Sequence, residues 1–200
     1  MNVRIYQASF DLLQRDFESL LEYIEPADAN AACYSHRAYA LLLRACTEFE
    51  SLARDLLVAS GDRTPRADMN VNDYRRLEGT LHLERCEVDF LGWRPKPRRI
   101  APYREWSTSQ PPLAWYRSYN TVKHNRDAEF HLANLGTVVE ALAALFTLTA
   151  KASDLEWPPC HWSLDKDGGS LWRGPFRLLD PSQLLPGSSA PANPAQPATP

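Results

Sequence analysis

Apolar residues recur every three or four positions along the first part of the chain, which is the period of one helix face. One such run spans roughly residues 6–25 and ends at Pro26, and a longer one spans about residues 32–60 and ends at Gly61. A shorter run over about residues 71–85 follows an Asn/Asp-rich segment that can cap it. The pattern therefore predicts three helices in this part of the chain.

Residues 86–112 have a different pattern, in which a short apolar segment precedes a stretch rich in proline and arginine. This composition predicts a small β-hairpin or an ordered loop. The same stretch holds the basic cluster of the chain, formed by Arg94, Lys96, Arg98, Arg99 and Arg104.

Pro111 and Pro112 fit the first turn of another helix, where a missing N–H is not needed. A helix that ran unbroken from there to Ser153 would be about 60 Å long, which exceeds a compact domain of this size. We therefore expect a break within residues 124–127, with Asn125 or Asp127 accepting hydrogen bonds from the first turn of the next helix.

Beyond Trp157 the chain becomes rich in Pro, Gly, Ser and Ala and loses its apolar period. We expect residues 158–200 to form a mostly disordered tail, in which only 171–179 could dock as a short extended piece. Residues 1–157 are then expected to form one mainly helical domain.

The bulk composition excludes few partners, because the formal net charge is only −3. The start of the chain lacks the pattern of a secretion signal, and the apolar run 137–150 is too short to span a bilayer and contains Glu140. We expect a cytoplasmic protein that does not enter the membrane. The four cysteines form no CxxC pair, so neither a metal site nor a cofactor is predicted.

Residues 115–134 form the densest polar segment, and two geometries are open for it. On a continuous helix, one polar stripe would face either a partner or the solvent; it would consist of Tyr116, Asn120, His124, Asp127, His131 and Asn134. With a break near residue 125, Arg126 would stand at a helix entrance. Arg126 and His131 lie about 140° apart on an ideal helix, so a break or a second subunit is needed to bring them together at a phosphate.

Three sequence segments resemble the HEPN superfamily. Arg126-Asp-Ala-Glu-Phe-His131 has the form of its Arg–His ribonuclease motif, although the same spacing occurs three more times in the chain. Two longer strings resemble a group of HEPN-like bacterial proteins, namely Leu43-Arg-Ala-Cys-Thr-Glu-Phe-Glu50 and Tyr119-Asn-Thr-Val-Lys-His-Asn-Arg126. The resemblance covers roughly residues 5–152. It implies an antiparallel bundle of four to five helices that acts as a homodimer.

The resemblance also implies a metal-independent endoribonuclease of toxin or defence type. His131 would be the general base and Arg126 the phosphate clamp, with His124 as a further catalytic candidate. The substrate-binding candidates are Lys123, Asn120, Asn125 and Asp127. RNA would be the substrate, the basic cluster at 94–104 could guide its backbone, and an antitoxin or regulatory protein would be a further partner.

The alternative function is a non-catalytic interaction or regulatory module, in which Lys123, His124 and Arg126 lock helix packing. Glu48 and Glu50 bear on this choice, because carboxylates within an apolar helix are seldom left unpaired. We expect one of them to meet Lys123 or Arg126 as a structural ion pair, unless both face water.

Overall fold

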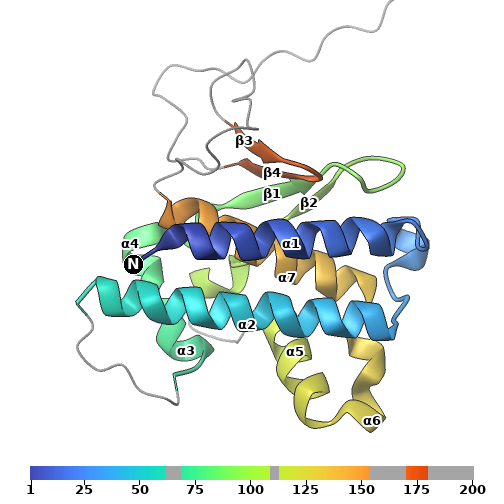
Figure 1. Ribbon diagram of the computed structural model, residues 1–200, viewed down its shortest axis with the longest axis horizontal. Coiled ribbons are helices and arrows are strands. Elements are labelled where there is room, and N and C mark those ends of the chain that lie inside the picture. Colours follow the sequence, from blue (N-terminus) through green and yellow to red (C-terminus); the bar gives the residue numbers. More distant parts are fainter. Residues whose placement is uncertain (62–68, 109–112, 154–169, 180–200) are drawn as a thin grey trace, which may run out of the picture.

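The computed structural model describes residues 1–61, 69–108, 113–153 and 170–179 (Figure 1). The α-helices are α1 (Val3–Leu21), α2 (His36–Ala59), α3 (Val71–Tyr74), α4 (Glu78–Leu81), α5 (Ala114–His124), α6 (Arg126–Glu129) and α7 (Leu135–Ala152). The short 3-10 helices are η1 (Asp28–Asn30), η2 (Arg75–Leu77), η3 (Leu83–Arg85), η4 (Arg104–Ser107) and η5 (Phe130–Leu132). The strands are β1 (Glu87–Phe90), β2 (Arg98–Ile100), β3 (Ser170–Arg173) and β4 (Phe176–Leu179). The protein is thus mainly helical with a small antiparallel sheet, which confirms the mainly helical fold predicted from the sequence.

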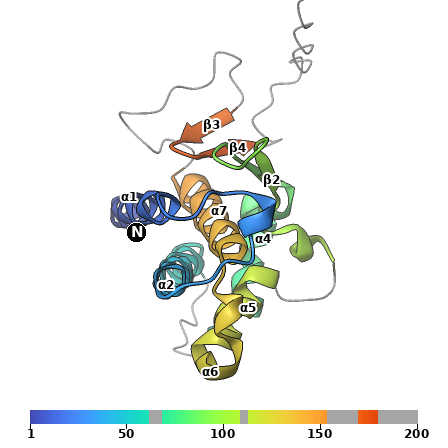
Figure 2. The same cartoon turned by 90° about the vertical axis from the view of Figure 1, so that its right-hand side faces the viewer.

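Helix α7 forms the centre of the molecule, because nearly every residue along it is buried. In the view along the long helices, α1 and α2 lie on one side of α7, the sheet lies above it and α5 lies below it (Figure 2). Its length and hydropathy alone would suit a membrane span, but its burial inside the protein is that of a core helix. Its half-buried Glu140 pairs with Arg98 at 3.0 Å, and burial raises the pKa of this carboxyl group.

The first two predicted helices are present with shifted ends, at 3–21 and 36–59. The third is wrong as a single helix, because residues 71–85 form two short α-helices alternating with 3-10 turns. His82 has φ of 50°, a left-handed conformation that ends α4 after one turn. Gly79 lies within α4, and glycine weakens a helix interior.

The β-hairpin expected near 86–112 is confirmed by the antiparallel pairing of β1 with β2. The sheet has the order β2-β1-β4-β3, because β4 pairs with the other edge of β1. Phe176 of β4 is fully buried and its ring packs against those of Phe10, Phe90 and Phe146. The β3–β4 hairpin, which lies beyond residue 157, is therefore packed as part of the same domain. Residues 154–169 and 180–200 lie outside the described residues.

The helix break expected within residues 124–127 is confirmed. Helix α5 ends at His124, and the short α6 and η5 lead to α7. Asn125 holds the N-cap position of α6, but its side chain accepts no hydrogen bond there, so the expected capping is wrong. The side-chain cap lies at the start of α7, where Asn134 Oδ1 accepts from the Thr137 N–H at 3.0 Å. Neither Asn125 nor Asp127 is at the start of α7, and the continuous polar stripe does not exist. Pro111 and Pro112 lie outside the described residues.

Candidate functional site

Arg126, the first residue of α6, is the centre of an exposed cluster at one end of the bundle. Its Nη2 lies 2.8 Å from Nδ1 of His36, in the first turn of α2. Its guanidinium carbon lies 4.5 Å from the ring centroid of Tyr39 and 5.2 Å from that of Phe130. We call Arg126, His36, Tyr39 and Phe130 the Arg126 cluster.

Local chain geometry builds this cluster from two distant segments. Ser35 caps α2 by accepting from the Ala38 N–H at 3.1 Å, which fixes His36 in the first turn. The segment before α2 is joined to the start of α7, where the Leu135 N–H donates to the Cys33 carbonyl at 2.9 Å. The break at Asn125 then turns α6 back over the first turn of α2.

The Arg126–His36 contact determines which imidazole nitrogen carries the proton in neutral His36. Arginine has no acceptor atom, so its N–H must donate and Nδ1 must accept. Nε2 of His36 then carries the hydrogen, and the exposed cluster offers both guanidinium and imidazole N–H donors. Such a donor set suits a phosphate or another anion.

His131 lies in η5, and its side chain is 58% exposed. Its Nε2 is 3.9 Å from Oε2 of Glu129, so a carboxylate stands beside the imidazole. In the described part of the chain, Arg126 and His131 make no hydrogen bond with one another. The structure therefore does not join the two expected catalytic residues directly within one protomer.

The other expected site residues differ in their exposure to solvent. His124, Asn125 and Asp127 are exposed, and Asn120 is half-buried on α5. The backbone of Asn125 is used at the break, because its N–H donates to the Thr121 carbonyl and its carbonyl accepts from the Glu129 N–H. His124 thus lies close in sequence to the Arg126 cluster but outside its contacts.

Lys123 and Glu50 belong to a tyrosine-rich contact between α5 and α2. The Tyr116 hydroxyl donates to Glu50 Oε1 at 2.6 Å, and Lys123 Nζ donates to the Tyr119 hydroxyl at 3.0 Å. The hydrogen bond to Tyr119, together with the nearby Glu50 carboxylate, raises the pKa of Lys123. Within the described residues, neither Glu50 nor Glu48 forms the expected ion pair with Lys123 or Arg126; Glu50 instead accepts a hydrogen bond from Tyr116.

Glu48 lies on a different face of α2 from Glu50, towards Tyr6 of α1. The pKa of the Tyr6 hydroxyl is raised, mainly by burial and in small part by the Glu48 charge. Tyr6 also donates to Asp55 Oδ2 at 2.7 Å. Glu48 thus lies near the contact between α1 and α2, where its charge acts on Tyr6.

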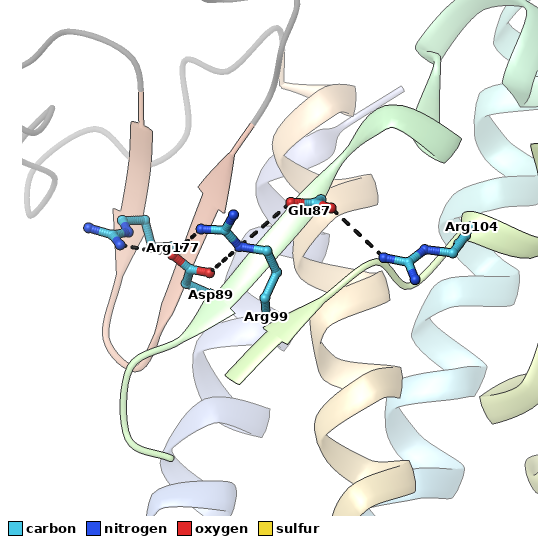
Figure 3. A network of polar contacts seen from close by, with 5 residues as sticks. All are labelled: Glu87, Asp89, Arg99, Arg104 and Arg177. Carbon is cyan, nitrogen blue, oxygen red and sulfur yellow. Dashed lines mark hydrogen bonds and ion pairs between the residues drawn. The ribbon is translucent and has the colours of Figure 1, made fainter. Parts of the chain in front are cut away.

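The arginines of the basic cluster are largely engaged with carboxylates (Figure 3). Arg99 Nε and Arg177 Nη2 lie 2.9 and 2.8 Å from the two carboxylate oxygens of Asp89, which is only 4% exposed. Although burial alone would raise the pKa of Asp89, the hydrogen bonds from Arg99 and Arg177 outweigh it and lower the pKa.

The remaining arginines of this cluster have carboxylate neighbours as well. Arg104 lies 3.9 Å from Glu87, Arg94 lies 3.6 Å from Glu25, and Arg98 pairs with Glu140. These carboxylates offset much of the positive charge that a nucleic-acid backbone would meet. The electropositive guide expected from the sequence is thus weakened, with only the exposed Lys96 lacking a carboxylate contact in the described residues.

Sequence patterns did not indicate the roles of His36, Tyr39 and Phe130. They join Arg126 only through the fold, since His36 and Arg126 are 90 positions apart. Comparisons with protein-family models, with curated proteins and with solved structures find no match to this chain. The candidate site therefore rests on its own geometry.

Proposed function

We propose that the protein is a HEPN-like, metal-independent endoribonuclease that binds the scissile phosphate of RNA at the Arg126 cluster. The observation that carries this proposal is the exposed Arg126 guanidinium, which two aromatic rings and the His36 imidazole support. A fixed guanidinium neutralises the charge that develops on phosphorus-bound oxygens, and such a group is worth about 2.7–4 kcal/mol in other enzymes.

His131 supplies the acid–base chemistry in this proposal. Its neutral imidazole removes the proton of a ribose 2′-hydroxyl, whose oxygen then bonds to the adjacent phosphorus. The bond from phosphorus to the 5′-oxygen breaks, leaving a 2′,3′-cyclic phosphate and a 5′-hydroxyl end. Glu129, 3.9 Å from the ring, stabilises the imidazolium that forms. The leaving 5′-oxygen takes a proton, for which His124, the further catalytic candidate, is the proposed donor.

A homodimer completes the proposed site. Arg126 and His131 make no mutual hydrogen bond within one protomer, and both are exposed at the same end of the bundle. A second copy packed against this end would bring His131 of one protomer towards Arg126 of the other. The proposal places this dimer in the cytoplasm, where an antitoxin or regulatory protein that covers the same end would keep it inactive.

A second function, a non-catalytic interaction module, is favoured by a different observation. Arg126 and Lys123 both contact other side chains of their own chain, and Arg126 ties α6 to α2. In that case the segment 119–126 would stabilise the bundle without touching RNA.

RNA cleavage in EDTA separates the two functions. The substrate is a single-stranded RNA, and the matched control is DNA of the same sequence, which lacks the nucleophilic 2′-hydroxyl. We expect wild-type protein to cut only the RNA and to leave cyclic phosphate ends, with strong losses in Arg126→Ala and His131→Ala. Background cleavage by all three proteins, with a clear loss of stability in Arg126→Ala, would favour the non-catalytic module.

A further inference from the structure

Three side chains of metal-binding type converge at the junction between α4 and β1. Glu78, His82 and Glu84 each place one ligand atom such that all three atoms lie within 4.8 Å of one another. In Figure 1 this junction, marked by α4, lies at the opposite end of the bundle from α6. It is thus separate from the Arg126 cluster.

The backbone holds these residues together. Glu78 and His82 are one helical turn apart, and the His82 N–H donates to the Glu78 carbonyl at 3.1 Å. The left-handed conformation of His82 then reverses the chain, so that the Glu84 N–H lies 3.2 Å from both carboxylate oxygens of Glu78. The convergence follows from ordered backbone, which limits the entropy that a ligand must overcome.

The charges around this junction leave a place for a cation. Glu84 Oε2 is buried without a hydrogen-bond partner, whereas Oε1 accepts from Arg85 Nε at 3.1 Å. The imidazole of His82 is exposed, and within the described residues no hydrogen bond engages it. A buried carboxylate oxygen without a partner is unusual and requires a reason. A positive ion between the two carboxylates and the imidazole would supply that partner.

We propose that Glu78, His82 and Glu84 bind one divalent transition-metal ion, of which Zn²⁺ is the representative. An imidazole with two carboxylates selects such an ion over Mg²⁺ or Ca²⁺, which prefer all-oxygen sites. Bonds of about 2.0–2.2 Å in a tetrahedral site place the ligand atoms about 3.3–3.6 Å apart. The ligand atoms of the three side chains therefore need to approach one another by up to about 1.5 Å, and water completes the coordination.

The bound ion would stabilise the turn that leads from the helices into the sheet. It cross-links α4 to η3, directly before β1, and thereby holds the left-handed His82 in place. This site goes beyond the proposed ribonuclease function, whose chemistry uses no metal. Cleavage in EDTA and metal binding therefore succeed or fail independently.

Calorimetric titration of metal-free full-length protein with Zn²⁺ tests the site. We expect one ion per chain, and an affinity at least about tenfold weaker in His82→Asn and in Glu84→Gln. Asparagine tolerates the left-handed conformation of residue 82, so His82→Asn removes the ligand without opposing the backbone. The matched control is His131→Gln, which removes another exposed imidazole beside a glutamate and should leave the affinity unchanged.

Folding and ion type are checked in the same proteins. Glu78→Gln keeps an oxygen that can accept from Glu84, so it should retain the wild-type circular dichroism spectrum while binding Zn²⁺ less tightly. Zn²⁺ should raise the melting temperature of wild type but not of His82→Asn, and Mg²⁺ should raise neither. Equal Zn²⁺ affinity in wild type and His82→Asn, or undetectable binding by wild type, would overturn the proposal.

Discussion

Nη2 of Arg126 lies 2.8 Å from Nδ1 of His36 and thereby joins α6 to the first turn of α2. The contact leaves the remaining guanidinium N–H groups and the imidazole Nε2–H exposed to a ligand. One interaction thus both holds the turn after α5 and orders the side chains that we propose to bind the phosphate.

Replacing Arg126 should affect activity more than stability. Arg126→Ala should lower the rate of RNA cleavage by about 10²–10³-fold, because a fixed charge that stabilises the transition state is lost. The two exposed cation–π contacts contribute about 0.5–1 kcal/mol each and the exposed hydrogen bond to His36 about 0.5 kcal/mol, so the free energy of unfolding should fall by about 1.5–2.5 kcal/mol. Arg126→Lys keeps the charge but loses the planar fork, and should recover part of the rate. A fall in stability with an unchanged rate would contradict this role.

The hydrogen bond between Tyr116 and Glu50 should be a main contact between α5 and α2. Tyr116→Phe leaves the half-buried Glu50 carboxylate without its 2.6 Å donor, and should cost about 1.5–3 kcal/mol in urea unfolding. Tyr119→Phe is the matched control, because its hydroxyl accepts only from the exposed Lys123 and should cost under about 1 kcal/mol. Equal losses in the two variants would show that Glu50 does not depend on Tyr116.

Asp89 should give the protein part of its stability above pH 4. Its pKa in the folded protein lies below the ordinary value of about 3.9, so its contribution is present above that value and disappears as the pH falls through the lowered pKa. Asp89→Asn should therefore cost about 1.5–3 kcal/mol at pH 7, towards the lower end because Arg99 is 57% exposed.

The pH dependence of unfolding distinguishes Asp89 from its neighbour. The difference in stability between wild type and Asp89→Asn should shrink as the pH is lowered from 5 to 2. Glu87→Gln is the control, since Glu87 is 37% exposed and lies 3.6 and 3.9 Å from its arginines. A difference that stays constant with pH would argue against the assigned role of the Asp89 charge.

Asn134 should stabilise the start of α7. Asn134→Ala removes the cap on the Thr137 N–H, which typically costs about 0.5–2 kcal/mol. Asn125→Ala, at the break expected from the sequence, should cost less, because the side chain of Asn125 makes no capping hydrogen bond to α6. The comparison is made by thermal unfolding of the two variants, and the reverse order would restore Asn125 as the cap.

The sequence predicted the long helices, the hairpin and the break because each depends on local patterns. Apolar period, proline and helix length are sufficient to place α1, α2 and the end of α5. The cap of α7 was misplaced because two asparagines flank the same polar segment, and only tertiary contacts choose between them. The β3–β4 hairpin was underestimated because strand pairing of β4 with β1 is a long-range event.

The candidate site was predictable only in part. The polar segment around Arg126 identifies this residue as a candidate, but His36 and Tyr39 contact it from α2, and His36 is 90 positions away in the sequence. The carboxylates that neutralise part of the basic cluster were missed for the same reason, since Arg98 meets Glu140 of α7 and Arg94 meets Glu25 only in the folded chain. Local sequence patterns show which polar residues lie near one another in the chain. Which residues they contact depends on how the fold brings distant segments together.

In the proposed ribonuclease, Arg126 of one protomer and His131 of the other form one RNA-cleaving site. The most direct measurement mixes Arg126→Ala and His131→Ala proteins, lets them exchange subunits, and follows RNA cleavage in EDTA. Each mixed dimer would hold one intact site, so we predict recovery to about a quarter of the wild-type rate, although each variant alone is inactive. A mixture as inactive as its two components would contradict the shared site.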